Sequence, residues 1–203
     1  MRWVQHWIIG HNCRKGRRSL PYQLGCLLPD WFDRHPIHRT TESMEHVLDM
    51  AVRLRDCPPG PLRDWRLGVL SHFLCDYCTQ AHNEEYYRFY RHRVYEVMAQ
   101  KRILALRRED PEGLARIDRA EPPPPLPGRD AGDEVFRAAF RAFLLEELEH
   151  LHRAIRGLNS PCWYRDQRIM DLDIRWAHRL VWSMLWLFGE ADRKNWEGAD
   201  NGS

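Results

Sequence analysis

The sequence predicts an all-α fold, organised as a single-domain bundle of several helices. No stretch shows the strict apolar–polar alternation that marks a half-buried strand. Instead, apolar residues recur three and four positions apart in several segments, as they do on one face of a helix. At 203 residues, the chain is long enough to bury one core without disulfide staples. We expect this domain to span residues 1–190, with 191–203 as a disordered tail.

Local breaks divide the first half of the chain into helical segments. Residues 3–13 are apolar and aromatic and predict a first helix. An apolar run at 20–28 ends where a proline follows, because proline disfavours helical backbone in the residue before it. Residues 43–55 have helical spacing of apolar side chains, and the segment CPPGP at 57–61 is a clear break. Asp64 can then cap a long central helix.

The second half is simpler. A further helix is expected from about 84 to 108, followed by a proline-rich connector at about 119–130. Helices at 134–156 and 171–188 would then complete the bundle within residues 131–190. The second of these two helices is rich in tryptophan, which suits either a dense helical core or an aromatic-lined pocket.

Composition excludes several classes of protein. A net charge of +2 gives no general attraction to nucleic acid or membranes. The pair Cys75 and Cys78 has no second such pair, so neither a zinc ribbon nor a thioredoxin motif is supported. The longest apolar run near the C-terminus, 180–188, is too short to cross a bilayer. Residues 1–18 lack the order of a signal peptide, so we expect a cytoplasmic protein.

The segment 67–96 carries the main functional signal. His72 and Asp76 lie four apart on one helical face, as do His92 and Glu96. His82 lies roughly 80° around from His72, which suits a neighbouring metal ion. A lone helical histidine is usually a surface or core residue, but an unpaired carboxylate among apolar neighbours is costly, and a divalent cation satisfies it. We therefore predict a polynuclear metal site.

A rival metal motif lies in the second half. Glu147 and His150, and also Glu149 and His152, have the Glu-x-x-His spacing of di-iron four-helix bundles. That architecture takes such a motif from two different helices, whereas both copies here overlap on one. A solvated helical face is the favoured interpretation.

The spacing His72-x3-Asp76-x5-His82, followed by His92-x3-Glu96, resembles the core of the zinc-dependent phospholipases C. The related fungal single-strand-specific zinc nucleases share this resemblance. The apolar run ending at Asp30 is similar to the family's early metal-bridging aspartate. The resemblance covers residues 3–100 and implies an all-α bundle of the phospholipase C and zinc nuclease type, with clustered zinc ions.

Carried over to this chain, the resemblance implies two or three zinc ions and eight ligands. The first ion would be held by Asp30, His38, His72 and Asp76, and the second by His82, His92 and Glu96. A third would use Asp76 again with His6. His11 is the alternative to His6, and His35 or His46 to His38. The secreted enzymes also use the amino group of a mature N-terminal tryptophan, whereas Trp3 here follows two residues.

The resemblance further implies hydrolysis of a phosphoric ester by activated water, with Asp30 serving as both ligand and general base. Residues beside Asp30 would bind the substrate, a small-molecule or lipid phosphodiester: Trp31, Phe32, Arg34 and Arg39. A nuclease-type phosphodiesterase is one alternative, although no basic groove with interleaved aromatic residues indicates nucleic acid. A non-catalytic, metal-stabilised helical protein is another.

Overall fold

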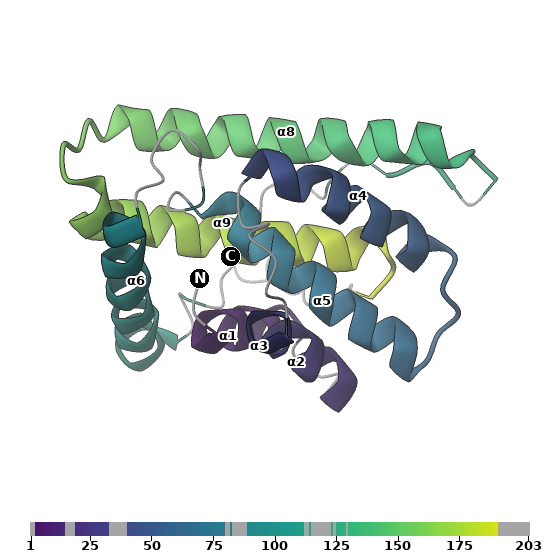
Figure 1. The fold of residues 1–203 in the computed structure, drawn as a ribbon, viewed down its shortest axis with the longest axis horizontal. Coiled ribbons are helices and arrows are strands. Elements are labelled where there is room, and N and C mark those ends of the chain that lie inside the picture. Colours follow the sequence, from purple (N-terminus) through teal and green to yellow (C-terminus); the bar gives the residue numbers. More distant parts are fainter. Residues whose placement is uncertain are drawn as a thin grey trace, which may run out of the picture.

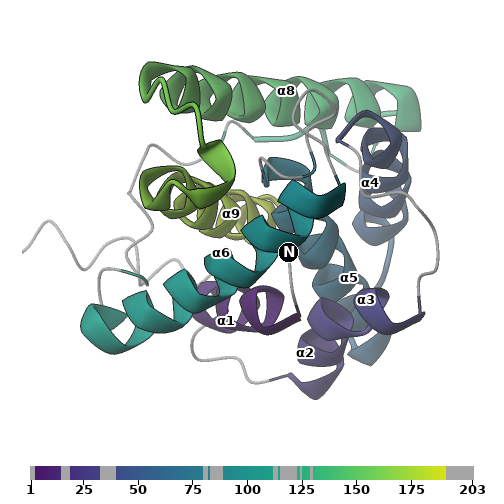
Figure 2. The ribbon, with the colours of Figure 1, turned by 60° about the vertical axis from the view of Figure 1, so that its left-hand side comes forward.

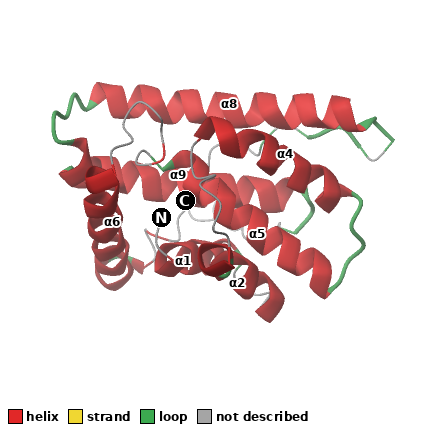
Figure 3. Ribbon diagram, viewed as in Figure 1, coloured by secondary structure: helices red, strands yellow, loops and turns green. Residues whose placement is uncertain are grey.

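The computed structural model describes residues 3–14, 19–32, 40–79, 82, 89–111, 114, 123, 125–128 and 130–190. Over these residues the chain is helical and contains no strand, as predicted (Figure 3). The elements are α1 (Trp3–Cys13), α2 (Leu20–Leu27), α3 (Pro29–Phe32), α4 (Thr40–Arg55), α5 (Pro61–Cys78), α6 (Phe89–Glu109), α8 (Asp133–Gly157), the short 3₁₀ helix η2 (Trp163–Arg165) and α9 (Gln167–Leu187).

The helices are arranged around α5 and α9. Figure 1 shows α8 along one side of the molecule and α1, α2 and α3 on the opposite side. Helix α5 packs against α1, α2, α4 and α9, and most of its residues are buried. Helix α6 lies across one end, where Figure 2 shows it passing in front of α9. No helix in the described part of the chain is both long and apolar enough to span a membrane.

The observed helices follow the expected segments with shifted ends. The helix expected at 43–55 begins earlier, at Thr40, and α6 ends close to the predicted boundary. The long central helix is α5, which ends at Cys78, before the further helix that was expected from about residue 84. The tail expected at 191–203 lies outside the described residues, as does much of the connector at 119–130.

Helix α5 begins before the predicted cap. Gly60 precedes the helix with a φ of 146°, and Pro61 starts it, since its fixed φ and missing N–H suit the first helical position. Asp64 therefore lies inside the first turn instead of capping it. Its carboxylate accepts hydrogen bonds from Arg14 Nη2 at 2.7 Å and Ser19 Oγ at 2.5 Å. This contact ties the start of α5 to the segment between α1 and α2.

Helices α2 and α5 touch backbone to backbone. A Cβ atom on Gly68 would lie 2.1 Å from the carbonyl oxygen of Tyr22 and 2.9 Å from Gly25 Cα. A Cβ atom on Gly25 would lie 2.4 Å from the carbonyl oxygen of Trp65. Neither contact leaves room for a side chain. The two glycines therefore set the distance between these helices.

Helix α1, which carries His6, is held against α9 by a buried histidine. His178 Nδ1 donates to the carbonyl oxygen of Ile174 at 2.8 Å, so Nε2 accepts from Asn12 Nδ2 at 3.3 Å. Cys13 Sγ donates to the carbonyl oxygen of His178 at 3.4 Å. Burial lowers the pKa of His178 to about 4, although its hydrogen bond to Ile174 acts in the opposite direction. His178 is thus a neutral core residue.

The first prediction concerns the glycine contact. We expect Gly68→Ala to lower the free energy of unfolding by about 3 kcal/mol, because α2 must move away from α5. The measurement is denaturant unfolding followed by circular dichroism. The matched control is Gly157→Ala, where no atom lies within 4 Å of the added Cβ and stability should be unchanged or slightly higher. Equal stability of Gly68→Ala and the wild type would contradict the close contact.

The second prediction concerns pH. His178 stays neutral in the fold, whereas the unfolded chain binds a proton below its ordinary pKa of 6.5. The stability from this difference is present above pH 6.5 and is lost as pH falls towards about 4. When the pH is lowered from 7.5 to 5.0, we expect the free energy of unfolding to fall by about 2 kcal/mol more in the wild type than in His178→Gln. His150→Gln, on an exposed position of α8, should behave like the wild type. An equal decrease in the free energy of unfolding in the wild type and in His178→Gln would contradict the prediction.

Candidate metal centre

Four potential ligands meet between α1, α3 and α5. They are His6 from α1, Asp30 from α3, and His72 and Asp76 from α5. His72 Nε2 lies 3.5 Å from Asp76 Oδ2 and 3.6 Å from Asp30 Oδ1. His6 Nε2 lies 3.4 Å from Asp76 Oδ1 and 3.9 Å from Asp30 Oδ2. The two imidazole rings are stacked, with centroids 3.9 Å apart. We call these residues the first ligand group.

A second ligand group forms where α6 approaches the end of α5. It consists of His82, just beyond α5, and of His92 and Glu96 on α6. The Nε2 atoms of His82 and His92 face each other at 3.3 Å. His92 Nε2 also lies 3.6 Å from Glu96 Oε1. The group thus gathers two imidazole nitrogens and a carboxylate.

Asp76 connects the two groups. Its Oδ1 atom lies 3.4 Å from His6 Nε2 in the first group and 3.7 Å from His82 Nε2 in the second. Its Oδ2 atom faces His72. The side chain of Asp76 is only 5% exposed, so its negative charge is directed at three imidazoles and not at bulk water. A carboxylate in this position can be shared by two neighbouring ions.

The spacing of these atoms fits a metal ion. Two ligand atoms, each about 2.0–2.1 Å from one tetrahedral zinc ion, are about 3.3 Å apart. The shortest separations between ligand atoms run from 3.3 to 3.9 Å, longer than strong hydrogen bonds between the same atoms, and all ligand atoms of each group lie within 4.8 Å of one another. Imidazole nitrogen and carboxylate oxygen are also the ligand types that zinc takes.

His72 gives the clearest test of this fit. Its Nδ1 lies 3.1 Å from the carbonyl oxygen of Cys26, which can only accept, so Nδ1 carries the proton. Its Nε2 is therefore an unprotonated acceptor, when the ring is neutral. That atom is buried without a hydrogen-bond partner and faces the two aspartates. An acceptor buried opposite carboxylates is unfavourable unless a cation lies between them.

The ligand groups are most exposed at two places. The Asp30 side chain is 22% exposed, and those of His92 and Glu96 are 15% and 12% exposed. The other four clustered side chains are 5% exposed or less. Water and a substrate would therefore reach the centre past Asp30 or past α6.

The structure brings together seven of the eight ligands that the sequence indicated. The eighth, His38, lies outside the described residues, as does its alternative His35. The alternative His46 instead meets Phe73 edge to face, with ring centroids 4.9 Å apart. His11, the alternative to His6, stacks on Trp7 and belongs to neither ligand group.

The residues expected to bind substrate are only partly placed. Trp31 and Phe32 form the end of α3, directly after Asp30, but the structure does not describe their side chains. Arg34 and Arg39 lie outside the described residues. Their assignment stays a prediction from the sequence.

The position of His6 bears on the third ion that the resemblance implies. The resemblance placed His6 with Asp76 at that ion, and His6 Nε2 lies 3.4 Å from Asp76 Oδ1. His6 also lies close to His72 and Asp30, because α1 packs directly against α5. Whether His6 serves the first ion or a third ion stays a prediction.

The residues of the rival Glu-x-x-His motifs form no ligand group in the described part of the chain. Both Glu147 carboxylate oxygens accept hydrogen bonds from Arg179, at 2.6 and 2.7 Å. His150 and Glu149 lie on exposed positions of α8, and Glu149 pairs with Arg156. These residues serve helix packing and a solvated face.

The sequence did not indicate two buried contacts of helices that carry ligands. The carbonyl oxygen of Cys26 orients His72. Because every residue has such a backbone atom, the amino-acid sequence does not indicate this contact. The buried pair of Tyr95 and Asp173 joins α6 to α9 across 78 positions of sequence. Asp173 lies in a helix with an apolar pattern. A buried acidic residue in such a helix must have a polar partner, but the sequence does not identify that partner.

Comparison with known proteins agrees with this geometry. A family model described as zinc dependent phospholipase C matches residues 8–146. The matched span begins just after His6, includes the other six clustered residues and ends within α8, before η2 and α9. No curated protein and no solved structure matches the chain significantly.

Proposed function

This chain belongs to the zinc-dependent phospholipase C family, and on that premise we propose that it hydrolyses phosphodiesters at a polynuclear zinc centre. The observation that carries the proposal is the position of Asp76 between two groups of potential zinc ligands. Family membership supports a zinc hydrolase. The reaction on a phosphodiester and the roles of individual residues are our proposal.

In this proposal the two ligand groups hold neighbouring zinc ions. Asp30, His38, His72 and Asp76 would hold the first ion, and His6 would hold a third ion together with Asp76. His82, His92 and Glu96 take the second, and Asp76 is shared between the two. A third ion remains a prediction of the family resemblance.

The residues of the chain have distinct tasks in this reaction. Zinc, when bound, supplies a Lewis acid that lowers the pKa of water and stabilises charge on the phosphoryl group. Cys26 holds the proton of His72 on Nδ1 through its carbonyl oxygen, which keeps Nε2 available as a ligand. Asp30 is the most exposed of the clustered residues, and its carboxylate can accept a proton from the attacking water.

Substrate binding falls to the residues that follow Asp30. Trp31 and Phe32 would contact the organic part of the substrate, and Arg34 and Arg39 its phosphate, because guanidinium groups match phosphate geometry. A small-molecule or lipid phosphodiester fits this set. The cytoplasmic location expected from the sequence stays a prediction.

Metal content tests the centre directly. We expect the wild type to retain two or three zinc ions per chain, measured by mass spectrometry after removal of loosely held metal. His72→Ala and His92→Ala should each lose about one ion, because each removes an imidazole from a different ligand group. The matched control, His150→Ala on the exposed face of α8, should keep the full content. A zinc-free wild type, with normal helicity and melting in the variants, would refute the hydrolase proposal.

Kinetics test the substrate-binding residues. We expect the double variant Arg34→Ala/Arg39→Ala to raise KM for a phosphodiester about 10-fold while changing kcat less, because guanidinium contacts bind phosphate before chemistry. The control is Arg153→Ala/Arg156→Ala on α8, whose side chains are 69% and 60% exposed and pair with Glu149. Unchanged kinetics in the first double variant would remove Arg34 and Arg39 from the site.

The same assay separates the alternative functions. Faster cleavage of single-stranded DNA than of phospholipid or small phosphodiesters would favour the nuclease-type activity. Tightly bound zinc without activity on any of them would favour the metal-stabilised, non-catalytic protein. An open coordination position on a bound zinc ion would favour an enzyme, because a structural zinc site is coordinatively closed.

A further inference from the structure

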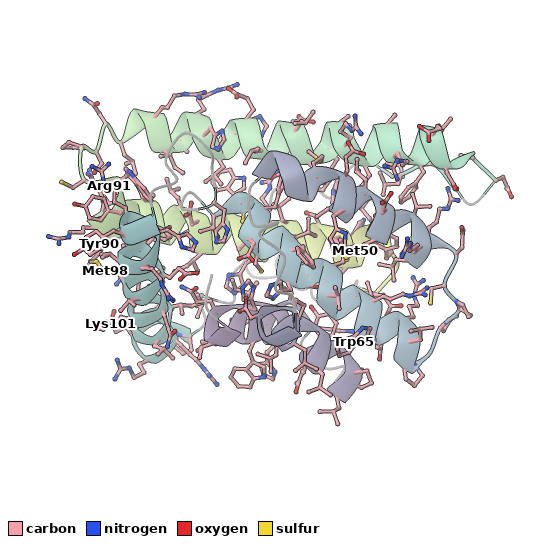
Figure 4. The ribbon with its side chains drawn as sticks, viewed as in Figure 1. Met50, Trp65, Tyr90, Arg91, Met98 and Lys101 are labelled. Atoms are coloured by element: carbon pink, nitrogen blue, oxygen red, sulfur yellow. The ribbon has the colours of Figure 1, made fainter. Side chains whose placement is uncertain are left out.

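Helix α6 supplies two ligands but depends on other helices for its position. His92 and Glu96 face inward, whereas Tyr90 and Lys101 project away from the molecule (Figure 4). Its main neighbours are η2 and α9, with a smaller contact to α1. The distance of His92 and Glu96 from the rest of the centre is therefore set largely by η2 and α9.

The tightest of these contacts is made by a residue that lies between the two ligands in sequence. Tyr95 is about 60° around α6 from His92 and about 100° from Glu96, on the buried side that faces α9. Its hydroxyl donates a hydrogen bond to Asp173 Oδ2 on α9. Both side chains are buried, at 1% exposure each. The Tyr95 ring also packs on Trp163 of η2, with centroids 5.6 Å apart. A hydrogen bond to a buried carboxylate is strong and directional, so it limits both rotation and sliding of α6.

A second link between the same helices lies further along α6. Arg102 donates to both carboxylate oxygens of Asp171, at 2.6 and 2.8 Å. Their side chains are 24% and 25% exposed, and Arg102 is more than one helical turn beyond Glu96. A partly hydrated pair at this distance constrains the ligands less. It is therefore a matched control for the buried pair.

We propose that Tyr95 and Asp173 are positioning residues for the second ligand group. By fixing α6 against α9, the pair sets where His92 and Glu96 stand relative to His82 and Asp76. It acts through the ligands and does not itself bind the ion. The expected effect on zinc binding rests on the proposed function. The restraint that the pair places on α6 does not, because it exists with or without metal.

Three variants separate this role from general stability. Tyr95→Phe keeps the ring and its packing on Trp163 but removes the donor. Asp173→Asn keeps an oxygen that can accept from Tyr95, so it should retain part of the effect. Arg102→Gln breaks the control link. Each metal-free protein is titrated with zinc against a chromophoric chelator, and its amide hydrogen exchange is followed over residues 89–99.

We expect Tyr95→Phe to bind one zinc ion about 10-fold more weakly, with the affinity for the other unchanged, as is typical when a residue supporting a ligand is lost. Asp173→Asn should be intermediate, and Arg102→Gln should match the wild type. In the metal-free proteins, exchange over 89–99 should be faster in Tyr95→Phe than in Arg102→Gln. Exchange within α5 should be equal in both.

Several results would overturn the inference. Exchange over 89–99 in Tyr95→Phe equal to that of the wild type would show that the pair does not hold α6. Equal weakening of both ions, with faster exchange throughout, would show a general stability contact. If Tyr95→Phe does not fold, Asp173→Asn carries the same comparison against Arg102→Gln. A wild type that binds no zinc would refute the proposed function, and the exchange comparison alone would then decide the inference.

Discussion

The buried carboxylate of Asp76 is the constraint around which the molecule is built. Three imidazoles face it from different parts of the chain, with His6, His72 and His82 nitrogens 3.4, 3.5 and 3.7 Å from its oxygens. A charge so shielded from water is tolerated only where cations or donors surround it. Helices α1 and α5 and the segment after α5 must therefore converge on one point. A bound dication would complete that convergence, so folding and metal binding are expected to support each other.

Contacts outside the ligand groups also hold these helices in place. Gly25 and Gly68 let α2 and α5 touch, and this contact brings the Cys26 carbonyl to His72. Arg63 lies at the start of α5. It donates at 2.9 Å to the carbonyl oxygens of Leu54, Cys57 and Phe188, which joins the ends of α4 and α9 to the start of α5. His72 and Asp76 therefore lie on a helix that is restrained at its start and near its middle.

Much of this arrangement could be predicted from local pattern. Helical spacing indicated the helices and the all-α class, and the i, i+4 pairs indicated which side chains share a face. Pro61 could have indicated the start of α5 better than Asp64, because proline suits the first helical position. Helical periodicity alone could not place His6 beside Asp76 and His72, since it fixes a residue's face but not the helix it meets; only the family resemblance indicated that His6 lies near Asp76. The Tyr95–Asp173 contact is equally non-local, and only tertiary packing pairs them.

The six cysteines of this chain carry a consequence for handling the protein. Cys75 and Cys78 flank Asp76 in sequence. Burial raises the pKa of both thiols well above the usual value; nearby thiols and Asp76 raise that of Cys75 further, and Asp173 and Asp76 raise that of Cys78. Both side chains are buried, so reagents in solution do not reach them in the folded protein. Cys162 alone of the six is exposed, so a maleimide dye should label the native protein at one position, remote in sequence from all the clustered histidines.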